Sequence, residues 1–293
     1  MARARLSLEG LSIGDAFGER FFGPPDRALR MIEKRMLPAS PWAWTDDTAM
    51  ALSIVDVLDA KGGIDRDALA AAFASRHASD PDRGYGGAAH DILAAICAGT
   101  PWREAAGSVF DGHGSMGNGS AMRVAPLGAY FADDLEKAAA HARASADPTH
   151  AHPDGAAGAV AVVVAAAVAW QIGACARPDD PLALLEEAFA RTPDGPTRDG
   201  IAAARALSLS TSPALAAGKL GSGRRVICSD TVPFALWCAA RHLDDYEHAM
   251  WSTVSGLGDR DTTCAIVGGI VAVRVGEMGL PPAFRSAREP LAT

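Results

Sequence analysis

Runs of Ala, Leu and Val separated by Gly, Pro and Asp dominate the hydrophobic pattern of the chain. No segment has the alternating row of β-branched residues that is typical of a strand, and the apolar positions recur with helical spacing. The pattern therefore predicts an all-α, multi-helix fold. The predicted helices cover residues 47–60, 66–78, 87–98, 120–131, 134–146, 155–176, 181–191, 199–209, 231–243, 245–254 and 262–277.

The organisation of the chain indicates one compact domain over residues 1–293. The turn-rich segments at 111–119 and 192–200 are short, no repeat is present, and no shift in composition marks a boundary. Alanine-rich helices approach one another closely. We therefore expect the functional groups at helix ends and in loops.

One apolar segment, residues 156–176, has the length of a membrane span. It consists mostly of Ala, Val and Gly, contains Gln171, and lacks basic flanks and an aromatic belt. These features favour a buried central helix and no membrane association.

Composition limits the kinds of partner. The chain has 293 residues, 49% of them hydrophobic, which is enough for a sizeable core. Its net charge is −8, with 27 basic and 35 acidic residues and no dense Lys/Arg block, so a nucleic-acid surface is disfavoured and a small ligand is expected. Five cysteines without a CxxC pair do not form a disulfide framework, and the N-terminus lacks the apolar run of a secretory signal. We expect a cytoplasmic protein.

Two predicted helices begin with acidic clusters. In "WTDDT", Thr45 is expected to be the N-cap, which places Asp46 and Asp47 in the first turn, where the helix dipole favours negative charge. In "GDRDTT", Asp259, Asp261 and Thr262 repeat the arrangement. Helix capping explains one such cluster more easily than two.

If the two helix heads face each other, four carboxylates and two hydroxyls converge. That charge density is unfavourable without cations. Oxygen donors without His or Cys suit Mg²⁺, Mn²⁺ or Ca²⁺ better than Zn²⁺, and two clusters suit a pair of ions. Two separate, solvated helix caps are the alternative.

The loops between these clusters also carry polar residues. Gly117, Asn118 and Gly119 precede a predicted helix, so they form either an anion site or a plain loop capped by Ser120. Arg123, one turn further, is expected in a structural ion pair, with an acidic cluster or a phosphate as the alternative. The segments 20–41 and 215–227 are expected to be loops.

Two further loops offer ligand-binding side chains. His150 and His152 lack a His or Cys partner at the spacing of a zinc site, so His150 either hydrogen-bonds a ligand or caps structure. Tyr85 lies between glycines and either packs on the core or meets a ligand. Asp230 and Thr231 are expected to cap a buried helix whose first turn contains Pro233.

The chain resembles the ADP-ribosylglycohydrolases, a family that includes the dinitrogenase reductase-activating glycohydrolase and the ADP-ribosyl-acceptor hydrolases. Seven motifs carry the resemblance, and they follow the order of the family along nearly the whole chain. They are "GLSIGDAFGE", "WTDDT", "RGYGG", "GNGSAMRVAPLG", "THAHPDG", "SDTVPFALW" and "GDRDTT".

The resemblance implies a compact all-α fold with two divalent cations, Mg²⁺ or Mn²⁺, at the bottom of an ADP-ribose cleft. It assigns the metal ligands to Thr45, Asp46, Asp47, Asp259, Asp261 and Thr262. It assigns substrate binding to Gly84, Tyr85, Gly86, Ser115, Gly117, Asn118, Gly119 and His150. The catalytic residues it implies are Glu19, Asp46, Asp47 and Asp261.

The implied activity is hydrolysis of the glycosidic bond of an ADP-ribosyl group on a protein side chain or small molecule. The alternatives are an inactive ADP-ribose-binding relative and a metal-dependent hydrolase of another nucleotide. Two departures from the family pattern matter. Arg260 replaces the middle threonine of the second metal motif, Gly-Asp-Thr-Asp-Thr in many members of the family. The acidic residue expected after the Gly-Asp-Ala-x-Gly turn is either Glu19, which we favour, or Asp26.

Overall fold

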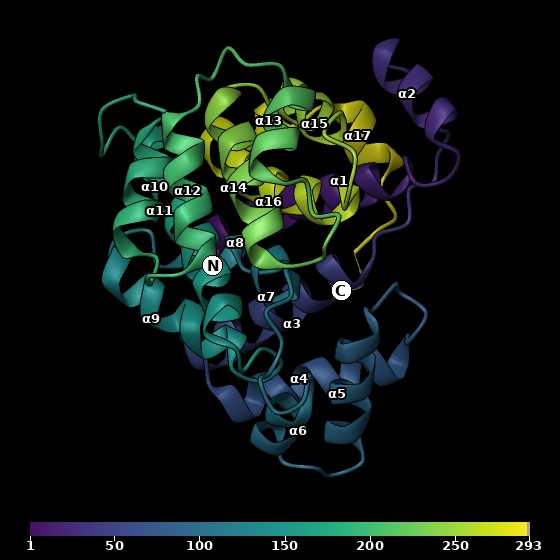
Figure 1. Ribbon diagram of the computed structural model, residues 1–293, viewed down its shortest axis with the longest axis vertical. Helices are drawn as coiled ribbons and strands as arrows, with labels where there is room; N and C mark the ends of the chain where they lie inside the picture. The colour runs from purple at the N-terminus through teal and green to yellow at the C-terminus, as the bar shows by residue number, and fades with distance from the viewer. Residues whose placement is uncertain (292–293) are drawn as a thin grey trace.

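The computed structural model describes residues 1–291, and two long helices organise it. Helix α10 (Pro153–Gly173) packs against α7, α8, α9, α11 and α14, and helix α16 (Arg260–Val275) packs against α1, α14 and α15. These two helices also contact each other, and the helices within residues 66–108 form a group to one side of them, at the bottom of the view (Figure 1).

The other helices have the following bounds: α1 Ala2–Glu19, α2 Pro25–Glu33, α3 Asp46–Lys61, α4 Arg66–Ser79, α5 Gly87–Cys97, α6 Trp102–Ser108, α7 Gly119–Met122, α8 Ala125–Tyr130, α9 Leu135–Ala146, α11 Ala183–Arg191, α12 Pro196–Ala206, α13 Pro213–Leu220, α14 Cys228–Arg241, α15 Tyr246–Val254 and α17 Pro282–Ala287, with a 3₁₀ turn at Glu277–Gly279. No β-strand occurs in residues 1–291, which contain only two isolated bridges. The prediction of an all-α fold is confirmed.

Helix α10 is the one helix in the described residues that is long and apolar enough to cross a membrane. Its side chains are nevertheless almost all buried inside the protein, from Ala157 to Ala169 without an exposed position. The prediction of a buried central helix is confirmed. All five cysteines are free thiols, and Cys228, Cys238 and Cys264 lie in the core as expected.

Helix α1 is absent from the sequence prediction because it contains Gly10, Gly14 and Gly18, and glycine disfavours a helix interior. These glycines recur every fourth residue and form one stripe that lies against α16. A methyl group at Gly10 would stand 2.5 Å from the carbonyl oxygen of Gly268, and one at Gly18 would stand 2.2 Å from that of Arg260. Close contact of the two backbones therefore requires glycine and brings α1 alongside the start of α16.

Further differences from the sequence prediction are each confined to one segment. The segments 20–41 and 215–227 are not loops throughout, since α2 and the end of α13 lie within them, and α6 was not predicted. The helix predicted over 120–131 is divided into α7 and α8, because Pro126 has no N–H to donate to the preceding turn. Pro233 lies in the second turn of its helix, not the first, because α14 already begins at Cys228.

Candidate active site

A cavity of about 760 Å³ lies where the N-terminal ends of α3, α5 and α16 meet the loops before α7 and α10. That volume is typical of a small-molecule site. Both acidic helix heads reach it, through Asp46 on α3 and through Asp259, Asp261 and Thr262 at α16. The two clusters thus face a common space, which is the condition under which the sequence analysis invokes cations.

Asp15 of α1 joins the first acidic cluster, and the sequence analysis assigned it no role. Its Oδ2 accepts hydrogen bonds from the backbone N–H groups of Thr45 (2.9 Å) and Thr48 (3.1 Å), and its Oδ1 accepts one from Thr45 Oγ1 (2.8 Å). The carboxylate is fully buried. One feature of the sequence could have identified Asp15: it is an acidic residue within the motif "GLSIGDAFGE", whose small residues indicate burial. A buried carboxylate needs hydrogen-bond donors as partners.

Thr45 is the N-cap of α3, as predicted, but its hydroxyl does not cap the helix. The Thr48 N–H, which an N-cap side chain would normally bind, donates to Asp15 instead. The hydroxyl of Thr45 lies 2.8 Å from Asp15 Oδ1 and 3.0 Å from Asp47 Oδ2. A residue of another helix therefore caps α3 and leaves Thr45 among the carboxylates.

Asn118 connects the second acidic cluster to the Gly-Asn-Gly loop. Its Nδ2 donates to Asp259 Oδ2 (2.7 Å) and to Thr231 Oγ1 (3.0 Å), and the side chain is buried. Asp261 Oδ1 accepts from the backbone N–H of Thr262 at 2.8 Å. The loop thus orients Asp259 toward the cavity.

The carboxylates disturb one another electrostatically. Burial, with the negative charges of Asp15 and Asp259, raises the pKa of Asp46 to about 7. Burial raises the pKa of Asp47 well above its ordinary value, with Asp15 and Asp261 adding to the effect. The pKa of Asp261 is likewise raised well above its ordinary value, by burial and then by Asp259. These groups do not ionise together without a source of positive charge.

The donor set suits hard divalent cations. Asp47 Oδ1 is buried without a hydrogen-bond partner, although a buried carboxylate oxygen normally has one. The groups that act on Asp47 are the hydroxyl of Thr45 and the neighbouring carboxylates, which are the kinds of ligand that Mg²⁺ and Mn²⁺ prefer. Within residues 1–291, no three His, Cys, Asp or Glu side chains are already grouped as a metal site. The residue types fit the cations that the sequence predicts; the carboxylates are close enough to raise one another's pKa but are not grouped around a single point.

The loop before α7 supplies fewer free amides than the sequence suggested. The N–H of Gly117 donates to Ser115 Oγ (3.1 Å), and that of Asn118 donates to the carbonyl of Val226 (3.2 Å). Helix α7 has only four residues, Gly119–Met122. Ser115, Gly117, Asn118 and Gly119 all line the cavity, but a long helix N-terminus does not support them.

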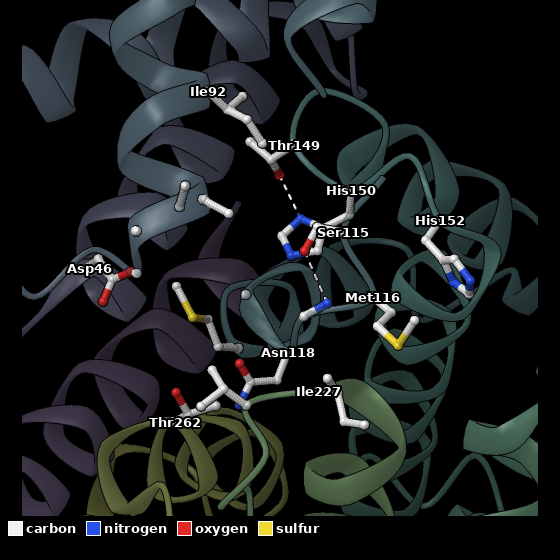
Figure 2. A pocket seen from close by; sticks show the side chains of 18 of the residues that line it. Asp46, Ile92, Ser115, Met116, Asn118, Thr149, His150, His152, Ile227 and Thr262 are labelled. Carbon is white, nitrogen blue, oxygen red and sulfur yellow. Dashed lines mark hydrogen bonds between the residues drawn. The ribbon is translucent and has the colours of Figure 1, made fainter. Parts of the chain in front are cut away.

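His150 lies beside this loop, and its ring faces the cavity (Figure 2). Its Nδ1 is 2.8 Å from Thr149 Oγ1. Burial, with the nearby positive charge of Arg123, holds the pKa of His150 well below its ordinary value, so the ring is neutral. His152 also lines the cavity, and its Nδ1 accepts from the N–H of Asp154 as the N-cap of α10.

Arg123 is buried, and the expectation of a structural ion pair is wrong. No carboxylate in residues 1–291 lies within salt-bridge distance of it. Its Nη2 donates to the carbonyl of Ser145 (3.0 Å) and to Thr149 Oγ1 (2.8 Å). Burial lowers the pKa of Arg123 to about 9, while the charge of Asp46 opposes that shift.

The glycines of "RGYGG" reach the cavity, whereas the ring of Tyr85 packs away from it. Gly84 and Gly86 are lining residues, and Gly84 has φ +87°, which favours glycine. The Tyr85 ring packs edge-on against His77, with centroids 4.8 Å apart, and Tyr85 is not among the lining residues. The loop is held to the first cluster because Asp46 N–H donates to the Arg83 carbonyl (2.7 Å).

Glu19 and Asp26 occupy different surroundings. Glu19 ends α1 and is half-buried, and burial with the charges of Asp15 and Asp259 raises its pKa. It does not line the cavity itself. Asp26 is exposed in the first turn of α2, which projects from the body of the protein (Figure 1). The preference for Glu19 as the acidic residue near the clusters agrees with this geometry.

Part of the cavity wall is apolar, and sequence reasoning did not identify the residues that form it. They come from three separate segments that only the tertiary fold brings together, so no local motif marks them. They are Ile92, Phe110, Met116, Val226 and Ile227.

Comparison with known proteins gives a consistent result. The family model described as ADP-ribosylglycohydrolase matches residues 1–292. The ADP-ribosylhydrolase ARH3 of Gallus gallus is 29% identical over 98% of this chain and 89% of that protein. The human protein of the same name is 33% identical, but the match covers 58% of this chain and only about half (51%) of the human protein.

A solved structure has a similar fold. The match to an ADP-ribosylglycohydrolase-related protein complex has a TM-score of 0.70 and covers 98% of this chain and 92% of that chain. The two sequences are 23% identical, so the likeness concerns the fold.

Proposed function

Because the chain belongs to the ADP-ribosylglycohydrolase family, we propose that it hydrolyses the glycosidic bond of an ADP-ribosyl group and releases ADP-ribose, with two divalent cations at its acidic clusters. The acceptor is a protein side chain or a small molecule.

The order of chemical groups across the cavity carries this proposal. In Figure 2, Asp46 and Thr262 lie on one side, His150, Ser115 and Asn118 between, and Met116, Ile227 and His152 on the other side. ADP-ribose has the same order, with a hydroxyl-rich ribose, a diphosphate and an adenosine. Its base suits an apolar wall, and its distal ribose suits oxygen-rich clusters with cations.

The middle of the cavity suits a diphosphate. The neutral ring of His150 and the hydroxyl of Ser115 are donors there, and Asn118 holds the adjacent loop. The lowered pKa of Arg123 still leaves it a cation at neutral pH, close behind His150. The N–H of Gly117 already donates to Ser115 Oγ, so its contribution to binding is small. Gly117 contributes instead by having no side chain, which lets the ligand come close to the backbone.

The proposed metal ligands are Thr45, Asp46, Asp47, Asp259, Asp261 and Thr262. The unpartnered oxygen of Asp47 and the mutually raised pKa values support this assignment. When bound, Mg²⁺ or Mn²⁺ neutralises the carboxylates, orients the distal ribose and polarises water. Asp15 and Asn118 are positioning residues, since each holds one cluster by hydrogen bonds.

In the proposed reaction, the bond between the anomeric carbon and the acceptor breaks and the oxygen of a water molecule bonds to that carbon. The acceptor leaves with one proton of the water. Developing positive charge on the sugar ring is stabilised by the carboxylates nearby. Glu19, with its raised pKa, is suited to exchange a proton with a water molecule that reaches it from the cavity, and Asp46 and Asp261, which line the cavity, orient the sugar. Arg260 beside the second cluster lies over Phe22 (5.0 Å to the ring centroid), which gives this end of the site a cation that influences the choice of acceptor.

The test combines binding with product analysis. ADP-ribose is titrated calorimetrically into protein loaded with Mg²⁺ or Mn²⁺ and again after chelation. Peptides ADP-ribosylated on serine or on arginine are then incubated with the same protein, and the products are identified by mass spectrometry. We expect cation-dependent binding and release of free ADP-ribose.

The alternatives give different results. Binding without turnover on any ADP-ribosylated peptide would indicate an inactive ADP-ribose-binding relative. Release of phosphate from nucleotides without ADP-ribose binding would indicate a hydrolase of another nucleotide. Asp46→Asn and Asp261→Asn should abolish turnover. Asp59→Asn, which changes an exposed carboxylate on the same helix as Asp46, is the matched control and should not.

A further inference from the structure

Arg123 is the most deeply buried cation near the cavity, and its contacts are unusual for an arginine. It has no accessible surface, its Nη1 lies 3.3 Å from Met50 Sδ, and its guanidinium stacks over Phe73 at 4.3 Å from the ring centroid. Its Nε has no hydrogen-bond partner. Burial of a guanidinium with an unpaired N–H and no carboxylate partner costs free energy. Packing alone therefore does not explain an arginine at this position.

The hydrogen bonds of Arg123 lead to His150. Arg123 Nη2 donates to Thr149 Oγ1 at 2.8 Å, and the same oxygen lies 2.8 Å from His150 Nδ1. Arginine only donates hydrogen bonds, so Thr149 accepts on that side. Thr149 and His150 are both buried.

One arrangement of protons gives the buried hydroxyl of Thr149 an acceptor. The Thr149 hydroxyl has no other acceptor in residues 1–291 than His150 Nδ1. If Nδ1 carried the ring proton, the threonine proton would be buried and unpaired, at the cost of a lost hydrogen bond. The satisfied arrangement has Thr149 donating to Nδ1, and the ring proton is then on Nε2.

The Nε2 atom lies on the ligand side of the ring, beneath the Gly-Asn-Gly loop. A methyl group at Gly117 or at Gly119 would stand 3.4 Å from it. Both glycines therefore leave the Nε2–H uncovered, and the ring itself lines the cavity (Figure 2).

We infer that Arg123 and Thr149 form a relay that fixes His150 as the neutral Nε2–H tautomer, so that it presents one N–H donor to a phosphate oxygen of the ligand. The value of this donor for binding rests on the proposed function. The tautomer itself does not, because it follows from contacts within the protein. The positive charge of Arg123 also disfavours a second proton on the ring, so His150 remains a directed single donor.

The test uses Thr149→Val, which removes the hydroxyl at nearly constant volume, and Thr149→Ser, which keeps it. The first readout is the ¹⁵N spectrum of the imidazole in ligand-free protein labelled with [¹⁵N]histidine, with His150→Gln to assign the signal. We expect Nε2–H in the wild type and in Thr149→Ser. Thr149→Val should lose that preference. An Nε2–H tautomer that persists in Thr149→Val would overturn the inference.

The second readout is the dissociation constant for ADP-ribose in a double-mutant cycle. Thr149→Val should weaken binding about tenfold, the effect of one hydrogen bond to a charged group. In the His150→Gln background it should have no further effect, because the relay acts only through His150. Independent, additive losses would mean that Thr149 is merely structural and would overturn the relay.

Failure of the relay and failure of the proposed function are distinguishable. A wild-type protein with the Nε2–H tautomer, lost in Thr149→Val, but without affinity for ADP-ribose would keep the relay and refute the proposed ligand. Far-ultraviolet circular dichroism and thermal melting of each variant confirm that the fold is intact.

Discussion

Gly14 of α1 lies so close to Cys264 of α16 that a methyl group at Gly14 would stand 2.1 Å from the Cys264 carbonyl oxygen. The next residue, Asp15, makes the hydrogen bonds that cap α3. The contact between two backbones thus fixes the distance between the acidic heads of α3 and α16. The glycine stripe positions the candidate site.

The first prediction follows from this contact. Gly14→Ala should separate α1 from α16, lower the free energy of unfolding by about 1–3 kcal/mol, the usual effect of overpacking, and lower turnover. Urea denaturation and initial rates measure the two effects. Gly218→Ala is the matched control, because Gly218 lies within α13 with nothing near its missing side chain and should be neutral or stabilising. Equal behaviour of both variants would contradict the packing argument.

The helix heads were predictable from the sequence, whereas the helix that joins them was not. Thr and Asp before an apolar run are a local signal of a helix start, and the structure has α3 and α16 begin there. Glycine at every fourth position of α1 is a local signal against a helix. Packing against α16 outweighs this preference and makes α1 helical. Helix α16 lies about 250 residues away in the chain, so no local pattern reveals the contact.

The second prediction concerns the crowded carboxylates. Asp47→Asn should raise the melting temperature of chelated protein, because it replaces a buried carboxyl group whose ionisation is opposed by burial and by the neighbouring carboxylates, and should abolish turnover. A gain of 1 kcal/mol corresponds to roughly 2 °C for a protein of this size. Asp59→Asn, at an exposed position of the same helix, should change neither quantity by much. A less stable chelated Asp47→Asn would indicate that the charge is not repelled.

The third prediction is that added Mg²⁺ or Mn²⁺ stabilises the wild type. Cations that bind only the folded protein raise the free energy of unfolding by about 2.7 kcal/mol at a concentration one hundred times the dissociation constant. Differential scanning fluorimetry over a series of cation concentrations measures the shift. The shift should disappear in Asp261→Asn. A melting temperature independent of cations would argue against the proposed metal centre.

The site itself was only partly readable. Residues next to each other in the chain, such as Asp46 and Asp47, form patterns that point to chemistry. Asp15 and the apolar wall at Phe110 and Ile227 reach the site from distant segments. Tyr85 had a suggestive neighbourhood of glycines, yet the ring turns to His77, because the orientation of a side chain depends on its tertiary neighbours.

The fourth prediction is a pH dependence away from the site. Burial, with Arg241 and His248 adding to it, lowers the pKa of His242 to about 4, against about 6.5 in an unfolded chain. The folded state therefore keeps His242 neutral, so its contribution is complete above pH 6.5 and is lost as the pH falls toward 4. Urea unfolding of His242→Gln should depend less on pH in that window than the wild type, and exposed His113→Gln should not differ from it.

The fifth prediction tests how the Gly-Asn-Gly loop supports the second acidic cluster. Asn118→Ala removes the donor to Asp259 Oδ2 and should lower kcat/KM about tenfold or more, since hydrogen bonds to charged groups are strong. Thr231→Val is the matched control. It removes the second acceptor of the Asn118 amide, together with the hydrogen bond from Thr231 to the Ile227 carbonyl, and leaves the bond to Asp259 in place, so its effect should be smaller. If Thr231→Val lowered kcat/KM as much as Asn118→Ala, burial of the amide, and not its bond to Asp259, would be what matters.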